Sequence, residues 1–357
     1  MKVTYIGGGN IGTLMAAESA IRGHDVTIYT SHPEIWNKDI KIIDSDQKTT
    51  LTGHINRITA DLKDAIKNAD VVFITYPPQM FFSFAKKLMP LLKTGQCVGV
   101  VPGAGGAEFA FRDLREKGIM LFGMQRVHCI SRLEEYGKTV KALGHKPELF
   151  VGSIPAGEAD KAAAITEDLL GIKTHPTANY LSVTLTPSNP ILHTSRIVSM
   201  FNDYKPGTIY PHNQYFYKEW TEDAARKYLE CSNETQELCK AIPLDLRSVE
   251  AIQKRLNART PKELAKAISN VKSLATIKSP VKMSDTGHGF VPDFESRYFK
   301  ADFPYGVRIL MDIGDIFDLD TPMIDSLWDW YEKVVPVKEE PEFRIIMSKE
   351  EFLDIYK

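Results

Sequence analysis

Residues 1–12 read MKVTYIGGGNIG, in which an apolar run, Val3 to Ile6, leads directly into a G-x-G-x-x-G spacing at residues 7–12. A segment of small and apolar residues, Thr13 to Ala20, follows, and the next apolar run, Asp25 to Thr30, has the composition of a strand. Strand, glycine turn, helix and strand in this order form the context in which a glycine-rich loop binds a dinucleotide.

Each residue of this loop has a physical role in such a site. Gly7 permits the tight turn, Gly9 lets backbone N–H groups approach a pyrophosphate, and Gly12 lets helix and strand pack closely. The N-terminus of the helix that follows supplies unpaired N–H donors and a partial positive charge for the phosphates, and Asn10 and Ile11 of the loop are included in the predicted site. The sequence therefore predicts a cofactor-binding turn over these five residues.

Strand and helix patterns alternate through the first half of the chain. The expected strands are 70–76, 97–101 and 119–124, followed by two strands in 139–154 joined by a turn, and the expected helices are 62–69, 81–91, 109–115 and 159–170. This alternation predicts a Rossmann-type doubly wound parallel sheet in a domain of residues 1–178. Ligands of such sheets bind at the carboxyl ends of strands, which adds Thr30, Ser31, Tyr76 and Pro77 to the predicted cofactor site.

The second half changes to helical spacing. Tyr228, Cys231, Thr235, Leu238 and Ile242 form one apolar stripe, and residues 262–274 and 309–331 have the same periodicity. We expect an all-α helical domain over residues 179–357, with a peripheral stretch from Val337. A nucleotide domain followed by a helical domain is typical of a dehydrogenase whose substrate binds between them.

Composition restricts the partners. The net charge of −2 and the pI near 6.5 give no electrostatic reason to expect nucleic acid or an anionic membrane as a partner. Apolar runs stay below the roughly 18 residues of a spanning helix, and Met1 leads straight into the first strand without a signal peptide pattern, so we expect a cytoplasmic protein. The four cysteines lack metal-ligand spacing, and no metal is expected. The oligomeric state stays open.

Hydride transfer needs a proton donor or acceptor near the reacting carbon, and histidine suits this task. Of the nine histidines, His193 stands in SNPILHTSRI, where Pro187 and Pro190 shape the entry into the first helix of the second domain. A histidine buried in the core is the alternative interpretation. His54, His145 and His175 lie beside turn-forming residues and are expected in solvent.

Five segments resemble the octopine/opine dehydrogenase family of the octopine–nopaline type. The opening GGGNIG resembles the family's glycine loop, and NPILH matches the position of its histidine at the start of the helical domain. The others are SRLEEYGKTVKALGHK (131–146), FYKEWTEDAARKYLECSNE (216–234) and, most specific of all, VPDFESRYFKADFPYG (291–306).

The resemblance implies that His193 is the acid/base, that Asp302 orients it and that Arg297 holds a substrate carboxylate. It also implies reductive condensation of an amino acid with a 2-oxo acid such as pyruvate, and the reverse oxidation, with NADH favoured over NADPH. Thr194 and Ser195 stand where relatives often have proline, and Lys300 and Ala301 stand where many relatives are more acidic; these departures bear on the choice of amino acid.

Two other functions stay open. A ketopantoate-reductase-like 2-oxo acid reductase would use a lysine of the helical domain, and no such lysine stands out. A dinucleotide-binding module without turnover is the non-enzymatic alternative. The residues after the second strand, Thr30-Ser31-His32, include neither the acid that selects NAD nor the arginine that selects NADP.

Overall fold

The computed structural model describes residues 1–186, 188–336 and 343–357. Pro187 and the first residues of the stretch expected to be peripheral, 337–342, lie outside the described residues. The chain forms two compact units, one of residues 1–184 with 352–357 and one of residues 185–351. This division falls after Thr184. The domain boundary expected between residues 178 and 179 stays a prediction.

The first unit is built on an eight-stranded sheet with the order β12-β11-β8-β7-β6-β1-β2-β5. Its strands are β1 (Lys2–Ile6), β2 (Asp25–Tyr29), β5 (Arg57–Thr59), β6 (Val71–Ile74), β7 (Cys97–Val100), β8 (Met120–Met124), β11 (Leu149–Ile154) and β12 (Thr174–Pro176). The helices of this unit are α1 (Asn10–Ile21), α2 (Leu62–Ile66), α3 (Phe81–Leu88), α4 (Ala107–Ala110), α5 (Ala159–Leu170) and α6 (Leu181–Thr184).

The sheet reverses its direction of growth at β1. This strand pairs in parallel with β2 on one side and with β6 on the other, so the chain crosses over between them. Such a switch point leaves a crevice at the carboxyl ends of the strands, where doubly wound sheets bind their ligands. The expected all-parallel pairing is wrong for one pair, because β11 runs antiparallel to β8.

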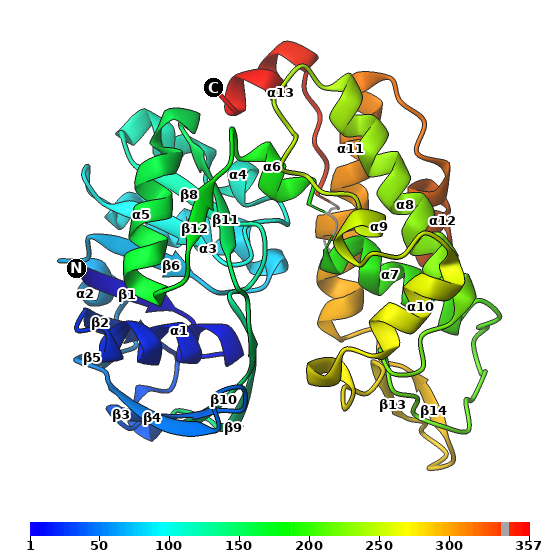
Figure 1. Cartoon of the computed structure of the whole chain (residues 1–357), viewed down its shortest axis with the longest axis horizontal. Coiled ribbons are helices and arrows are strands. Elements are labelled where there is room, and N and C mark those ends of the chain that lie inside the picture. The colour runs from blue at the N-terminus through cyan, green and yellow to red at the C-terminus, as the bar shows by residue number, and fades with distance from the viewer. Residues whose placement is uncertain (187, 337–342) are drawn as a thin grey trace. The chain divides into compact units, whose positions relative to one another are not determined.

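A second sheet covers α1 from the side away from the main sheet (Figure 1). It has the order β4-β3-β10-β9, formed by β3 (Asp39–Asp44), β4 (Thr49–His54), β9 (Cys129–Glu135) and β10 (Thr139–His145). The two strands expected in residues 139–154 are both present, but β10 belongs to this sheet and β11 to the main one. Gly53 of β4 permits the close packing, since a Cβ there would lie 2.3 Å from the Ala17 carbonyl oxygen.

A partly buried ionic cluster joins α1 to this second sheet. The Glu18 carboxylate lies 2.7 Å from His128 Nε2 and 2.8 Å from His145 Nε2. Burial alone would raise the pKa of Glu18, but the two histidines outweigh burial and lower that pKa to about 2. Contacts with Cys129 and Glu18 raise the pKa of His145 to about 10. The expectation that His145 lies in solvent is wrong.

His145 also faces two carboxylates of the β3–β4 turn. Its Nδ1 lies 3.9 Å from both Asp44 and Asp46, a cluster compact enough to hold a metal ion. Metal binding needs a neutral imidazole, and the raised pKa of His145 keeps this ring protonated at neutral pH. We therefore interpret the cluster as a set of ion pairs that links the second sheet to the helix that follows the glycine turn.

We expect Glu18→Gln to destabilise the protein in a pH-dependent way. The depressed pKa of Glu18 gives stability that is complete above its unfolded value of 4.5 and is lost as pH falls through about 2. The raised pKa of His145 gives stability that is complete below 6.5 and is lost as pH rises through about 10. When thermal midpoints are measured across pH, the difference between wild type and variant should therefore be largest at pH 4.5–6.5. A gap that does not change with pH would contradict this account.

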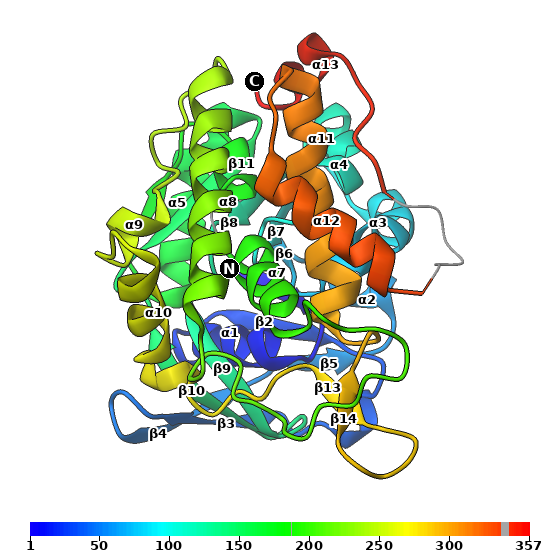
Figure 2. The same ribbon diagram turned by 90° about the vertical axis from the view of Figure 1, so that its right-hand side faces the viewer.

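The second unit is helical, with α7 (Asn189–Met200) packed against α8 (Glu222–Ala241) and α12 (Pro322–Val334), as Figure 2 shows. It also contains α9 (Ile252–Arg255), α10 (Pro261–Ser269), α11 (Arg308–Phe317) and a hairpin of β13 (Val281–Met283) and β14 (Phe290–Pro292). A π-helical segment, Tyr298–Val307, packs on α7 and leads into α11. The last helix, α13, spans Lys349–Ile355.

The periodic stretch 309–331 forms two helices where the sequence predicts one. Asp318 ends α11 in the left-handed conformation, with φ +55°, and Pro322 begins α12 at a position where a proline is well tolerated. Within the described residues, the structure has no helix that is long and apolar enough to cross a membrane.

Candidate functional site

The predicted cofactor turn connects β1 to α1. Gly7 adopts φ +109°, a conformation that L side chains rarely adopt, and its N–H donates to the Tyr29 carbonyl. Gly12 packs so closely that a Cβ would lie 2.0 Å from the Gly7 carbonyl oxygen. Ile11 packs against the core. The Asn10 carboxamide accepts a hydrogen bond from Leu133 N–H, so this side chain also holds β9 in place.

The start of α1 has the properties of an anion site. Gly9 is its N-cap residue and provides no side-chain hydrogen bond, and the first turn carries no acidic residue. A Cβ built on Gly9 would meet no atom within 4 Å, so the space in front of the first-turn N–H groups is open. These features fit the pyrophosphate of a dinucleotide.

The predicted residues of the neighbouring strand ends lie beside this turn in different environments. Thr30 is buried, and its hydroxyl lies 2.8 Å from the Tyr136 hydroxyl, whereas Ser31 is exposed. Tyr76 packs edge-on against Phe84, and burial raises its pKa to about 12, so its hydroxyl keeps its proton. Pro77 follows it, partly buried, at the start of a short turn of helix.

The aromatic neighbours of this turn could not be predicted from the sequence. A Cβ on Gly8 would lie 2.4 Å from the Trp36 indole, so the middle glycine, which the motif does not require, is required by packing. The Trp36 ring meets Tyr136 edge-on at 5.5 Å. The run of three glycines indicates close packing at this turn. Nothing in the neighbouring sequence identifies Trp36 as the residue that packs there.

In the second unit, α7 and the π-helical segment bring His193 and Asp302 together. His193 Nδ1 lies 2.7 Å from Asp302 Oδ2, although the two residues are 109 positions apart in the chain. His193 is fully buried and Asp302 is 8% exposed. A carboxylate only accepts hydrogen bonds, so Nδ1 carries the proton and Nε2 is the nitrogen that exchanges a proton in the neutral ring.

Aromatic residues surround the imidazole. The Tyr298 ring lies 4.6 Å from it and the Phe216 ring 5.6 Å from it, centroid to centroid. The Tyr217 hydroxyl lies 2.7 Å from His193 Nε2. The sequence could not distinguish this tyrosine from its aromatic neighbours in the core, because only the fold places one hydroxyl on the histidine.

Arg297 precedes the π-helical segment and is exposed. Its guanidinium lies over the Tyr298 ring, 5.2 Å from the centroid. Tyr298 also packs on His193, so Arg297 lies one aromatic ring away from the imidazole that Asp302 contacts. This cation is available for a bidentate contact with a substrate carboxylate.

The electrostatics leave His193 neutral in the free protein. Burial is the main cause that lowers its pKa below 6.5; the Asp302 carboxylate opposes this shift, and the Arg297 charge adds to it. A neutral imidazole in this environment is a base, and protonation makes it an acid that Asp302 stabilises. The structure thus brings together the three residues predicted in the helical unit and, separately, the residues predicted around the glycine turn.

Comparison with known proteins covers both units. Residues 176–335 match the family described as NAD/NADP octopine/nopaline dehydrogenase, alpha-helical domain, and residues 2–101 match NADP oxidoreductase coenzyme F420-dependent. Tauropine dehydrogenase of Arabella iricolor is 25% identical over 93% of this chain and 91% of its own. Opine dehydrogenase of Arthrobacter sp. (strain 1C) is 24% identical over 92% of this chain and 89% of its own.

A solved structure of octopine dehydrogenase with NADH and L-arginine is similar with a TM-score of 0.80 at 23% identity, over 93% of this chain and 89% of that one. The predicted fold class, a Rossmann-type sheet followed by a helical domain, is confirmed.

Proposed function

Because the chain belongs to the octopine/opine dehydrogenase family and is an NAD(P)-dependent oxidoreductase acting on the CH–NH group of its donors, we propose that it condenses the amine of an amino acid with a 2-oxo acid such as pyruvate. It reduces the resulting imine and also catalyses the reverse oxidation. The observation that carries the proposal is the buried 2.7 Å contact between His193 and Asp302.

His193 supplies the acid/base chemistry of this reaction. The amino acid arrives as an ammonium ion, and the neutral imidazole takes one of its protons so that the amine attacks the keto carbon. The carbinolamine that forms must lose water, and the imidazolium returns the proton to the leaving hydroxyl. Asp302 stabilises the imidazolium between these two steps. A bound nicotinamide dinucleotide supplies the hydride that reduces the imine carbon.

Arg297 has the chemistry to hold a carboxylate of the substrates. Its exposed guanidinium is anchored on the Tyr298 ring next to His193, and a bidentate pair would fix the carboxylate's orientation as well as its position. The exposed side chain keeps its donors accessible to a molecule that enters from solvent.

We favour NADH over NADPH as the reductant. The 2′-phosphate of NADPH needs a cation after β2, and residues 30–36 contain Glu34 but no lysine or arginine. His32 is the basic candidate there, and its Nδ1 already lies 3.3 Å from the Glu34 carboxylate. A dianionic phosphate would therefore meet an acidic residue at this strand end.

The proposal is tested by following NADH or NADPH oxidation with the purified protein, pyruvate and amino acids of each side-chain class. We expect oxidation only when both the amine and the oxo acid are present, and faster oxidation with NADH. Oxidation with the oxo acid alone would move the assignment to a simple 2-oxo acid reductase. Binding of NADH without turnover for any pair would favour the non-catalytic module.

A further inference from the structure

Both ring nitrogens of His193 are occupied by protein groups. Nδ1 donates to Asp302, and Nε2 lies 2.7 Å from the Tyr217 hydroxyl. The imidazole itself is fully buried. In this arrangement, the Tyr217 oxygen is therefore the atom that exchanges a proton directly with Nε2.

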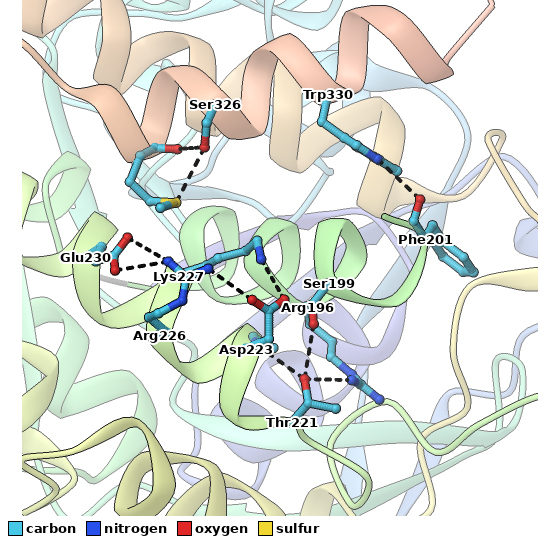
Figure 3. A network of polar contacts seen from close by, with 12 residues as sticks. Arg196, Ser199, Phe201, Thr221, Asp223, Arg226, Lys227, Glu230, Ser326 and Trp330 are labelled. Atoms are coloured by element: carbon cyan, nitrogen blue, oxygen red, sulfur yellow. Dashed lines mark hydrogen bonds and ion pairs between the residues drawn. The ribbon is translucent and has the colours of Figure 1, made fainter. Parts of the chain in front are cut away.

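The segment that carries Tyr217 is held firmly. Tyr217 lies in a turn before α8, and its ring stacks on Trp220 with centroids 6.2 Å apart and planes 16° apart. Arg196, one helical turn after His193, donates from Nε to the Phe216 carbonyl and from Nη2 to the Gln214 side chain. Its Nη1 reaches the Thr221 hydroxyl, which also caps α8, as Figure 3 shows.

Arg196 is 1% exposed, and burial lowers its pKa to about 10. The three hydrogen bonds above all go to neutral oxygens on both sides of Tyr217. A buried guanidinium is costly unless its donors are satisfied, so the segment 214–221 must keep this conformation to satisfy them. Arg196 thus holds the segment that carries Tyr217 against α7, the helix that carries His193.

We propose that Tyr217 is a further catalytic residue, which relays the proton between His193 Nε2 and the reacting oxygen or nitrogen. This inference rests on the proposed function. In the dehydration step, the Tyr217 O–H proton passes to the carbinolamine hydroxyl, which leaves as water, while the Tyr217 oxygen takes the proton of His193 Nε2. The carbinolamine and one proton give an iminium ion and water, the imidazolium becomes neutral, and the tyrosine ends unchanged.

The hydrogen bond supports both directions of transfer. With neutral His193, the Tyr217 hydroxyl donates to Nε2, and with the imidazolium, Nε2–H donates to the Tyr217 oxygen. Only the hydroxyl rotates between these states, because both rings are fixed by packing. Such a relay carries a proton out of a buried ring without exposing the ring to water.

Tyr217→Phe tests the relay, since it removes the hydroxyl and keeps the ring. We expect the turnover number to fall about 10²-fold, with KM values for both substrates within a few-fold of wild type. Tyr210→Phe is the matched control, because it removes a hydroxyl that donates to Asp203 elsewhere in the same unit, and should retain turnover. NADH binding and the thermal midpoint of both variants check the fold.

A second measurement separates a relay from a structural hydroxyl. Difluorotyrosine at position 217 keeps the ring and the hydroxyl but makes the phenol more acidic, so a relay shifts the high-pH fall of the turnover number to lower pH. An unshifted profile, or full turnover by Tyr217→Phe, would overturn the relay alone. A wild-type enzyme that shows no turnover requiring both substrates would overturn the relay and the proposed function together.

Discussion

Replacing His193 by alanine is expected to lower the turnover number about 10²- to 10⁴-fold, while NADH binds as tightly as in wild type. The buried imidazole, which we propose as the base, lies 2.7 Å from the Asp302 carboxylate, and the glycine turn proposed to bind the dinucleotide belongs to the other unit. Steady-state kinetics together with NADH fluorescence titration measure the two effects separately.

Asp302→Asn provides a finer test of the same pair. The carboxylate opposes the effect of burial on the pKa of His193, so its removal lowers that pKa further. The steps that need the imidazolium should then fail at lower pH than in wild type. The exposed His212 of the same unit is the control, and His212→Ala should retain full turnover. Equal activity of His193→Ala and His212→Ala would exclude His193 from the chemistry.

The second large effect is expected at Gly12. A Cβ there would lie 2.0 Å from the Gly7 carbonyl oxygen and 2.7 Å from Thr75 Oγ1, so α1 must move away from the turn. Overpacking costs about 1–3 kcal/mol or more, and Gly12→Ala should lower the thermal midpoint by about 5 °C or more. NADH binding should weaken as well, because the first turn of α1 is displaced from the position proposed for the pyrophosphate.

Gly9→Ala separates binding from folding. Its Cβ meets no protein atom within 4 Å, so the thermal midpoint without cofactor should match wild type, whereas the added methyl fills space in front of the first-turn N–H groups. Loss of one phosphate hydrogen bond weakens NADH binding about tenfold or more. Gly157→Ala, equally open, should change neither quantity. Unchanged NADH affinity in Gly9→Ala would place the pyrophosphate elsewhere.

Features that depend on neighbouring residues could be predicted from the sequence. The strand, glycine turn and helix of residues 1–21 form as expected, because the turn conformation and the close packing at Gly12 are local requirements. By contrast, the residues alone leave His193 as one of nine histidines. Family resemblance was needed to pair it with Asp302, which is 109 positions away.

Features set by long-range packing escaped prediction. The second sheet needs β3 to pair in parallel with β10, nearly a hundred residues later, and no local pattern selects that partner. The position of His145 also depends on long-range packing. Its turn-forming neighbours predict a solvent-exposed side chain, but the second sheet places its ring next to Glu18 on α1. Tyr217 differs from its aromatic neighbours only through the position of one hydroxyl on His193.

The most direct test of the central claim is the product formed from an amino acid, a 2-oxo acid and NADH that carries deuterium at the transferred position. We predict a secondary amine with one deuterium on the former keto carbon, whose mass equals both substrates less one oxygen atom plus the mass difference between deuterium and hydrogen, and no such product with His193→Ala. Deuterium found only in a 2-hydroxy acid, with no carbon–nitrogen bond formed, would contradict the assignment.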